Sequence, residues 1–279
     1  MNNLMLSSIL SLSGVGVLAA SILYIASKKF HVEEDPRIDQ VEGVLPMANC
    51  GGCGFAGCRN FAEAVVKAGK LDGLNCPVGG AECMAQVAHI MGVDVQETEP
   101  MVAVLRCNGS RKNAPQKTHY DGALNCFAAH ALFAGESGCP NGCLGLGDCA
   151  VACSFDAITV NPETGLPEVD DDKCVACGAC VTACPRDIYE LRPKGINSKR
   201  VYVACMNTQK GAPAKKNCSV ACIGCMKCVK ATESKSVSVK NFLSYIGTDV
   251  DTESHGPQLI DCCPTSAILG VNIEGSKNA

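Results

Sequence analysis

The hydrophobic pattern divides the chain into an apolar first segment and a cysteine-rich remainder. No charged side chain occurs from Leu4 to Ala26, and a helix of that length, at ~1.5 Å per residue, covers the roughly 30 Å of a bilayer core. Positive charges follow this segment, at Lys28 and Lys29, whereas in a signal peptide they precede it. We therefore expect an uncleaved single-pass anchor over residues 1–27, with the rest of the chain on the cytoplasmic side by the positive-inside rule.

Helical periodicity appears beyond a short charged segment. Residues 28–45 are charged and contain Pro36, which predicts a linker. Beyond Cys58, apolar side chains recur at the spacing of one helix face, at Phe61, Ala62, Val65, Val66 and Ala68. The pattern predicts one helix that begins at Cys58 and a second from Ala81 to Met91.

Short β-rich runs predict a mixed architecture in the rest of the chain. The run at residues 102–107 recurs at 201–205, and each copy is followed by a basic stretch, an Ala-Pro pair and another cysteine, which indicates an internal duplication. Three further strands are expected, each just after a cysteine (Cys153, Cys184 and Cys263). Proline and glycine within residues 161–170 predict a turn between strands.

The composition limits how such a chain can be stabilised. It has 279 residues, 22 cysteines, no tryptophan and 4% aromatic residues, so large conventional cores are excluded and metal clusters are expected to stabilise small domains. Gaps of two and three residues between cysteines argue against a disulfide framework. A net charge of −4 predicts no nucleic-acid partner.

The most specific motif is Cys174-x₂-Cys177-x₂-Cys180-x₃-Cys184 followed by Pro185. Three thiolates on one loop can bind three irons of a cubane, and the cysteine before proline ligates the other cluster in two-cluster ferredoxins. The motif therefore predicts [4Fe–4S] clusters, with ligands exchanged between neighbouring groups.

This rule assigns sixteen cysteines to four [4Fe–4S] clusters, three in the N-terminal and central groups and a fourth in the C-terminal group. Four thiolates also suit tetrahedral zinc, which stays open as an alternative for the first group. The four ligand sets are Cys50, Cys53, Cys58 and Cys76; Cys139, Cys143, Cys149 and Cys184; Cys153, Cys174, Cys177 and Cys180; and Cys222, Cys225, Cys228 and Cys263.

The C-terminal group has lost the ligands of a second cluster. Their positions are occupied by Thr232, Glu253, Gly256 and Leu259. Six cysteines remain unassigned, and we expect buried free thiols, although the pairs Cys107/Cys126 and Cys205/Cys218 leave open a further metal or a redox-active pair. The six are Cys83, Cys107, Cys126, Cys205, Cys218 and Cys262.

Three features together resemble the B subunit of the Rnf complex, the ion-translocating ferredoxin:NAD oxidoreductase. They are the N-terminal anchor, the string NCGGCGFAGC at residues 49–58, and GCLGLGDC at 142–149 leading to Cys153. The resemblance runs from residue 1 to about 270. It implies an iron–sulfur electron-relay subunit of a complex in the bacterial cytoplasmic membrane that couples electron transfer between ferredoxin and NAD to sodium or proton export. The implied partners are soluble ferredoxin and the other subunits, including a flavin- and NAD-binding one.

The expected fold class is small α+β: a transmembrane helix, a small helical 4Fe–4S domain, and ferredoxin-like modules with short strands. No nucleotide or substrate site is visible, so NAD chemistry is expected on a partner. Two alternatives stay open, an iron–sulfur subunit of a different anaerobic membrane oxidoreductase and a membrane-anchored zinc scaffold. The expected boundaries are an anchor (1–27), a linker (28–45), a four-cysteine domain (46–92), a connecting segment (93–135), a two-cluster ferredoxin-like domain (136–194), a one-cluster domain (195–270) and a tail (271–279).

Overall fold

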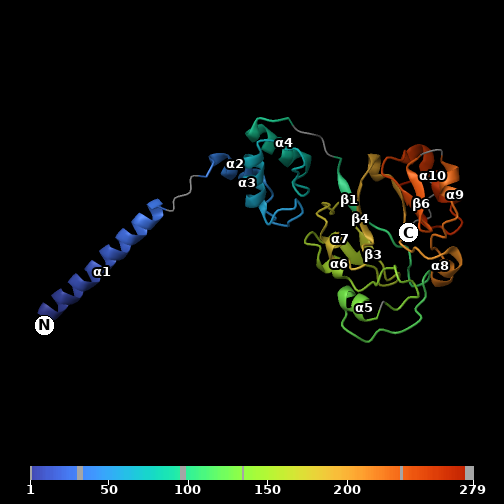
Figure 1. The fold of residues 1–279 in the computed structure, drawn as a ribbon, viewed down its shortest axis with the longest axis horizontal. Coiled ribbons are helices and arrows are strands. Elements are labelled where there is room, and N and C mark those ends of the chain that lie inside the picture. The colour runs from blue at the N-terminus through green and yellow to red at the C-terminus, as the bar shows by residue number, and fades with distance from the viewer. Residues whose placement is uncertain (1, 30–33, 95–98, 134, 233–234, 274–279) are drawn as a thin grey trace.

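A computed structural model describes residues 2–29, 34–94, 99–133, 135–232 and 235–273. The apolar first segment forms one helix, α1 (Asn2–Lys29), which lies apart from the other elements in Figure 1. Its window Leu12–Lys29 is long and apolar enough to cross a membrane, and none of that window is buried inside the structure. An unburied apolar helix of this length is consistent with membrane association.

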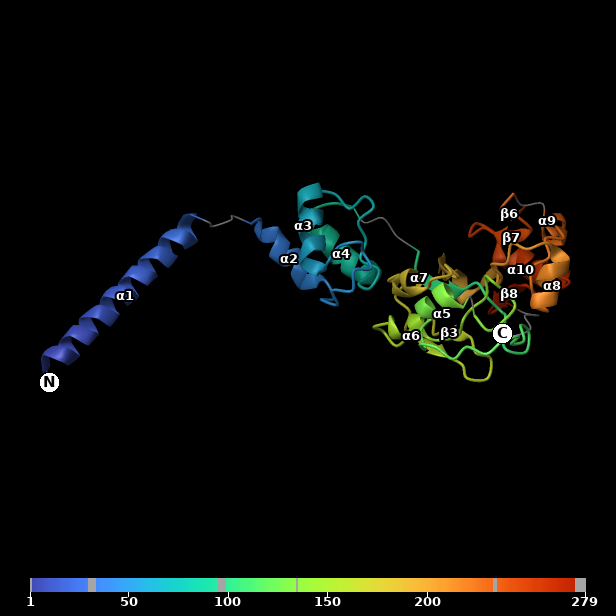
Figure 2. The same cartoon turned by 60° about the horizontal axis from the view of Figure 1, so that its bottom comes forward.

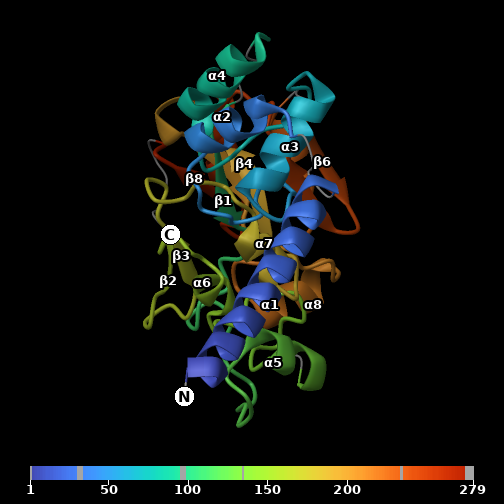
Figure 3. The same cartoon turned by 90° about the vertical axis from the view of Figure 1, so that its left-hand side faces the viewer.

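The next unit is a small helical domain. Figure 3, viewed from the α1 side, shows its three helices gathered together. They are α2 (Pro36–Val44), α3 (Cys58–Ala68) and α4 (Gly80–Met91). α2 contacts both other helices, and the core side chains Val41, Phe61, Val65 and Val87 are each at most 1% exposed. The helices expected at Cys58 and Ala81 are both present.

Helix α2 lies where the sequence suggested a linker. Asp35 caps it by accepting a hydrogen bond from the Arg37 backbone N–H, and Pro36 occupies its first turn, where the missing N–H costs nothing. Val41 and Leu45 are buried against the other two helices. The sequence predicts that Pro36 lies in a linker, but Pro36 is the first residue of α2. The helical domain therefore begins at Pro36.

The central module spans residues 101–193. Its longest strands, β1 (Met101–Leu105) and β4 (Tyr189–Pro193), pair antiparallel. β2 (Ile158–Val160) and β3 (Pro167–Val169) form the hairpin whose turn the sequence predicts. Three short helices complete the module: α5 (Cys126–Leu132), α6 (Asp148–Val151) and α7 (Ala179–Ala183). The sequence predicts a connecting segment at residues 93–135. Because β1 lies within this segment and pairs with β4, the segment contributes to the central module.

The C-terminal module spans residues 200–271 and lies beside the central one (Figure 2). A short 3₁₀ turn, η1 (Ile196–Ser198), precedes it. Its strands pair antiparallel as β5 (Arg200–Val203) with β8 (Ile268–Val271), and β6 (Val237–Lys240) with β7 (Leu243–Ile246). Its helices are α8 (Gly211–Asn217), α9 (Lys227–Ala231) and α10 (Thr252–Cys262). β8 extends to Val271, into the expected tail, of which residues 274–279 lie outside the described part.

The two modules repeat one arrangement, as the duplicated β runs suggest. Leu105 lies opposite Tyr189 in the first pair of strands, and Val203 lies opposite Ile268 in the second. Beyond these pairs, Arg106 donates its backbone N–H to the Ile188 oxygen at 2.7 Å, and Ala204 donates to the Ala267 oxygen at 2.8 Å. β1 and β5 pack together through Val102, Val104, Tyr202 and Ala204, which places the repeats against each other.

Candidate metal centres

The first cysteine group surrounds the N-terminal end of α3. Cys58 begins this helix, and its backbone N–H donates to the Asn49 side-chain oxygen at 2.9 Å. Cys58 and Cys76 are buried, while Cys50 and Cys53 are half-buried. Burial raises the pKa of the Cys76 thiol, and the charges of Cys53 and Cys58 act in the same direction. The structure therefore brings Cys53, Cys58 and Cys76 into one neighbourhood.

Cys83 lies beside this first group. Its thiol donates a hydrogen bond to the Val44 carbonyl at 3.3 Å. A Cβ added at Gly79 would lie 2.6 Å from the Cys83 sulfur and 3.4 Å from the Cys76 sulfur, so a residue without a side chain is needed between the two sulfurs. The buried thiol expected at Cys83 is present, since the residue is 8% exposed.

The group of Cys153, Cys174, Cys177 and Cys180 lines one cavity. Backbone amides point at two of the sulfurs: Ala157 donates to Cys153 at 3.4 Å, and Ala103 on β1 donates to Cys174 at 3.5 Å. Amide donors to sulfur are typical of thiolates that ligate an iron–sulfur cluster. This cavity holds all four residues that the crossing rule assigns to one cluster.

The C-terminal group has the same construction. One cavity is lined by all four of its cysteines, Cys222, Cys225, Cys228 and Cys263. Ala267 donates its backbone N–H to the Cys263 sulfur at 3.3 Å, which repeats the contact of Ala157 with Cys153. The Ser244 backbone N–H donates to the Cys222 sulfur at 3.4 Å. The four predicted ligands of this set again share one cavity.

A helix occupies the place of the lost second C-terminal cluster. Glu253, Gly256 and Leu259 lie on α10, and Leu259 is fully buried in the module core. A Cβ at Gly256 would come within 2.9 Å of the Ile273 side chain. Apolar packing therefore fills the space that a second cluster would need.

The remaining predicted set is divided between two places. Cys143, Cys149 and Cys184 lie close to Cys126. Burial raises the pKa of Cys143, and the charges of Cys107, Cys149 and then Cys126 add to this effect. The charge of Cys126 also contributes, after burial, to raising the pKa of Cys149, and that of Cys184 to raising the pKa of Cys126. The backbone N–H of Cys126 donates to an Asp148 carboxylate oxygen at 2.9 Å, which fixes α5 beside Cys149. Cys139 instead lines a separate cavity.

The distances between the sulfur atoms indicate which kind of metal centre the thiols can hold. Around a tetrahedral zinc, Zn–S bonds of ~2.3 Å bring the sulfurs to about 3.8 Å from one another. Among the described residues, no three His, Cys, Asp or Glu side chains converge closely enough to hold a single metal ion. Thiols that lie farther apart than this fit a cluster in which each sulfur binds a different iron.

Burial raises the pKa of several thiols in these sites. Burial raises the pKa of Cys180 to about 12, with the charges of Cys174 and Cys177 adding to the effect. Burial also raises the pKa of Cys222. Such thiols are neutral at physiological pH unless a cation binds the thiolates, so cluster insertion and proton release are coupled.

Several of the groups lie next to one another. The backbone of Gly52, in the first group, is so close to Cys177 that an added Cβ would lie 2.9 Å from its Cα. The charge of Cys50 contributes to raising the pKa of Cys177, after burial. The charge of Cys149 likewise contributes to raising the pKa of Cys180. The first, third and second groups therefore form a continuous series.

Two residues near the second group were not found from the sequence. Tyr189 is buried and its hydroxyl donates to the Cys149 sulfur at 3.4 Å. Arg186 donates to the carbonyl oxygens of Cys139 and Gly142. The only indication in the sequence was their position just after Cys184.

Comparisons with known proteins agree with this chemistry. A family model described as "Putative Fe-S cluster" matches residues 45–78, and one described as "4Fe-4S dicluster domain" matches residues 137–188. The chain is 41% identical to the B subunit of the Na(+)-translocating ferredoxin:NAD(+) oxidoreductase complex of Acetobacterium woodii, covering 98% of this chain and 81% of that one. It is 38% identical to the B subunit of the ion-translocating oxidoreductase complex of Methanosarcina acetivorans, covering 96% and 99%. It is 36% identical to the B subunit of the proton-translocating ferredoxin:NAD(+) oxidoreductase complex of Clostridium ljungdahlii, covering 92% and 89%.

Proposed function

Because the chain belongs to the B-subunit family of ion-translocating ferredoxin:NAD oxidoreductase complexes, we propose that it relays electrons between ferredoxin and a partner subunit that reacts with NAD. The observation that carries the proposal is the series of neighbouring four-thiol sites. Bound [4Fe–4S] clusters supply the one-electron chemistry. The polypeptide supplies thiolate ligands, backbone amides directed at sulfur, and burial that limits access of water.

Four sites follow from the sequence motifs. We propose the first from Cys50, Cys53, Cys58 and Cys76, the third from Cys153, Cys174, Cys177 and Cys180, and the fourth from Cys222, Cys225, Cys228 and Cys263. For the second we propose Cys126 with Cys143, Cys149 and Cys184, in place of Cys139. The support for this exchange is the position of Cys126 beside the other three thiols.

We further propose that α1 anchors the protein in the membrane with the thiol-bearing domains on the cytoplasmic side. The lysines at its C-terminal end, Lys28 and Lys29, favour this orientation. The proposed partners are soluble ferredoxin and the other subunits of the complex, including one that binds flavin and NAD. The transported ion is sodium or a proton in the named relatives.

The ligand assignment is tested by two neighbouring cysteines. Cys263→Ala is expected to remove one cluster, a loss of about four irons and four sulfides per chain from the anaerobically purified protein. Cys262→Ala is the matched control, because that thiol donates to the Leu259 carbonyl at 3.3 Å and does not line the cavity of the four predicted ligands, and it should lose none. Loss of the central paramagnetic signals in Cys263→Ala would contradict the ligand pairing.

The relay function is tested with the native complex. Reduced ferredoxin should bleach the visible absorption of the purified protein, and the protein should co-purify with flavin- and NAD-binding membrane subunits. A colourless protein without acid-labile sulfide, or co-purification with an unrelated reductase, would overturn the proposal.

A further inference from the structure

The cysteines left outside the four sites are not scattered. Four of them line one cavity between the two modules: Cys107, Cys139, Cys205 and Cys218. The cavities of the third and fourth sites are likewise each lined by four cysteines. All four residues are buried, between 7% and 9% exposed, and all four thiols are free.

The internal repeat accounts for this set, because each module contributes an equivalent pair. Cys107 follows β1 and Cys205 follows β5 at the same distance along the chain. Cys139 stands four residues before Cys143, and Cys218 stands four residues before Cys222. The cavity therefore lies where the two repeats meet, with two thiols from each.

Backbone amides point at the sulfurs with the same symmetry. The Cys107 sulfur accepts from the amides of Gly109 at 3.4 Å and Cys143 at 3.3 Å. The Cys205 sulfur accepts from the amides of Asn207 at 3.4 Å and Cys222 at 3.3 Å. Two amides on each sulfur stabilise a thiolate, as they do for iron–sulfur ligands.

A buried amide side chain completes the surroundings. Asn207 is 1% exposed, and its side-chain nitrogen lies 3.6 Å from the Cys139 sulfur in donor geometry. The Asn207 oxygen accepts from the Gln209 backbone at 2.8 Å, which orients the nitrogen toward the thiol. At Gly109 an added Cβ would lie 3.4 Å from the Cys107 sulfur and 3.7 Å from the Cys218 sulfur.

We propose that Cys107, Cys139, Cys205 and Cys218 hold a fifth [4Fe–4S] cluster at the junction of the two repeats. The ligand set follows from the cavity alone, whereas its role in the relay rests on the proposed function. On assembly, a preformed [4Fe–4S]²⁺ core is transferred from the four thiolates of a cluster carrier: four S–Fe bonds to the new thiols form as the four carrier S–Fe bonds break. The protons lost by the four thiols are taken up by the released carrier thiolates, and no electron is transferred in this step.

Other occupants fit this cavity less well. A single zinc ion would need the sulfurs about 3.8 Å apart, and the described residues contain no such convergence. Four unligated thiols would leave a void lined by small side chains in the core, which close packing disfavours.

The fifth site lies between the second site and the fourth site. The Cys143 amide touches the Cys107 sulfur, and Cys143 belongs to the second site. The Cys222 amide touches the Cys205 sulfur, and Cys222 belongs to the fourth site. The spatial order of sites is then first, third, second, fifth and fourth, and the fifth joins the two modules.

The test is iron and acid-labile sulfide per chain in the full-length, anaerobically reconstituted protein. Five clusters give about 20 irons. Cys218→Ala and Cys139→Ala should each give about 16, with the signals of the other clusters kept, whereas Cys126→Ala should lose the second cluster. Cys83→Ala, which removes a buried thiol outside all five sites, is the matched control and should keep about 20.

Alanine is used because serine can still bind iron. Paramagnetic resonance of the reduced protein guards against misfolding, since a variant that has only lost the fifth cluster retains the spectra of the first and fourth. A wild-type count near 16 that Cys218→Ala leaves unchanged would overturn the fifth site while leaving the proposed function intact. The absence of sulfide altogether would overturn both.

Discussion

Arg186 places a single positive charge between two groups of thiols. Burial lowers the pKa of its guanidinium, and the charges of Cys139 and Cys143 act in the opposite direction, but arginine stays protonated in proteins. Its bonds to the carbonyl oxygens of Cys139 and Gly142 hold it there. A fixed cation at this position favours the reduced, more negative state of a neighbouring cluster.

We therefore expect Arg186→Met to lower the reduction potential of the second centre by tens of millivolts, since about 1.4 kcal/mol corresponds to 59 mV for one electron. The measurement is a redox titration followed by paramagnetic resonance, with iron content unchanged. The control is Arg111→Met, an exposed arginine whose guanidinium donates to the Pro162 carbonyl at 2.8 Å. A shift of equal size in both variants would show that the position of Arg186 has no special effect.

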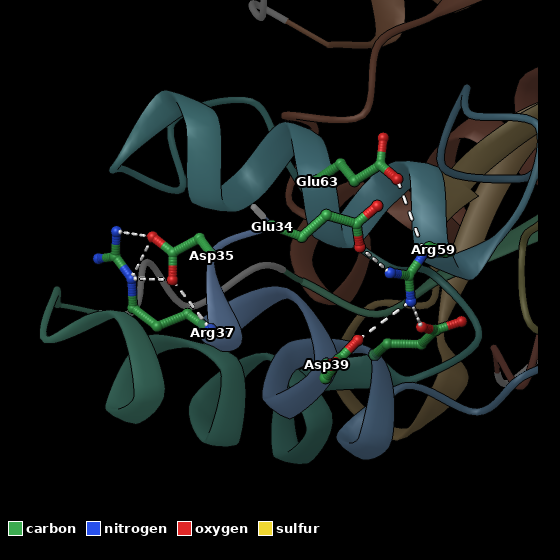
Figure 4. A network of polar contacts seen from close by, with 7 residues as sticks. Glu34, Asp35, Arg37, Asp39, Arg59 and Glu63 are labelled. Carbon is green, nitrogen blue, oxygen red and sulfur yellow. Dashed lines mark hydrogen bonds and ion pairs between the residues drawn. The ribbon is translucent and has the colours of Figure 1, made fainter. Parts of the chain in front are cut away.

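At the scale of elements, the N-terminal helical domain depends on its apolar core more than on its surface charges. Phe61 is 1% exposed and meets the Phe55 ring edge-on, with centroids 5.7 Å apart. Arg59 lies on the outside, where it pairs with Glu34, Asp39, Glu42 and Glu63 (Figure 4). Exposed ion pairs of this kind contribute little to stability.

Phe61→Ala is expected to destabilise the domain by about 3–5 kcal/mol, because it removes a large buried side chain. In a domain with so small a core, the loss should release the first cluster, about four irons per chain. Arg59→Met should retain them. The rate at which each variant releases iron to a chelator measures its loss of the first cluster. Faster release from Arg59→Met than from Phe61→Ala would contradict the prediction.

Local patterns predicted some elements and not others. α3 and α4 follow from apolar spacing, and the hairpin of β2 and β3 follows from its turn residues. The pairing of β1 with β4 joins residues more than 80 positions apart, so nothing in either segment indicates it. α10 contains Pro257, which argues against a helix unless tertiary packing fixes it.

The same limit applies to the cysteines. Spacing alone predicted a common site for cysteines on one loop, such as Cys174, Cys177 and Cys180, and these residues line one cavity. The placement of Cys126 beside Cys149, and of Cys139 beside Cys218, depends on how α5 and the two repeats pack. Sequence spacing carries no such information, and the set predicted with Cys139 stays a prediction that the variants above decide.

At the scale of the whole molecule, α1 and the thiol-bearing domains are structurally separate. The window Leu12–Lys29 of α1 has no buried part, so its removal costs the rest of the chain no packing. A chain starting at Glu34 is expected to stay in the soluble fraction with its full iron content, whereas the full chain should sediment with membranes. Carbonate extraction of the membranes checks this, and release of the full chain by carbonate would argue against a spanning helix.

Because the fifth site lies between the second and the fourth, electron transfer between the two modules is expected to depend on the junction between the repeats. If electrons pass between the second and fourth centres through the fifth, Cys218→Ala should slow the arrival of electrons at the far centre by orders of magnitude without changing that centre's own spectrum. Rapid mixing with reduced ferredoxin, followed by freeze-quench paramagnetic resonance, measures the delay, and Cys262→Ala serves as the unaffected control. Equal rates in the two variants would mean that the modules exchange electrons by another path, because the thiols at the junction are then unnecessary for transfer.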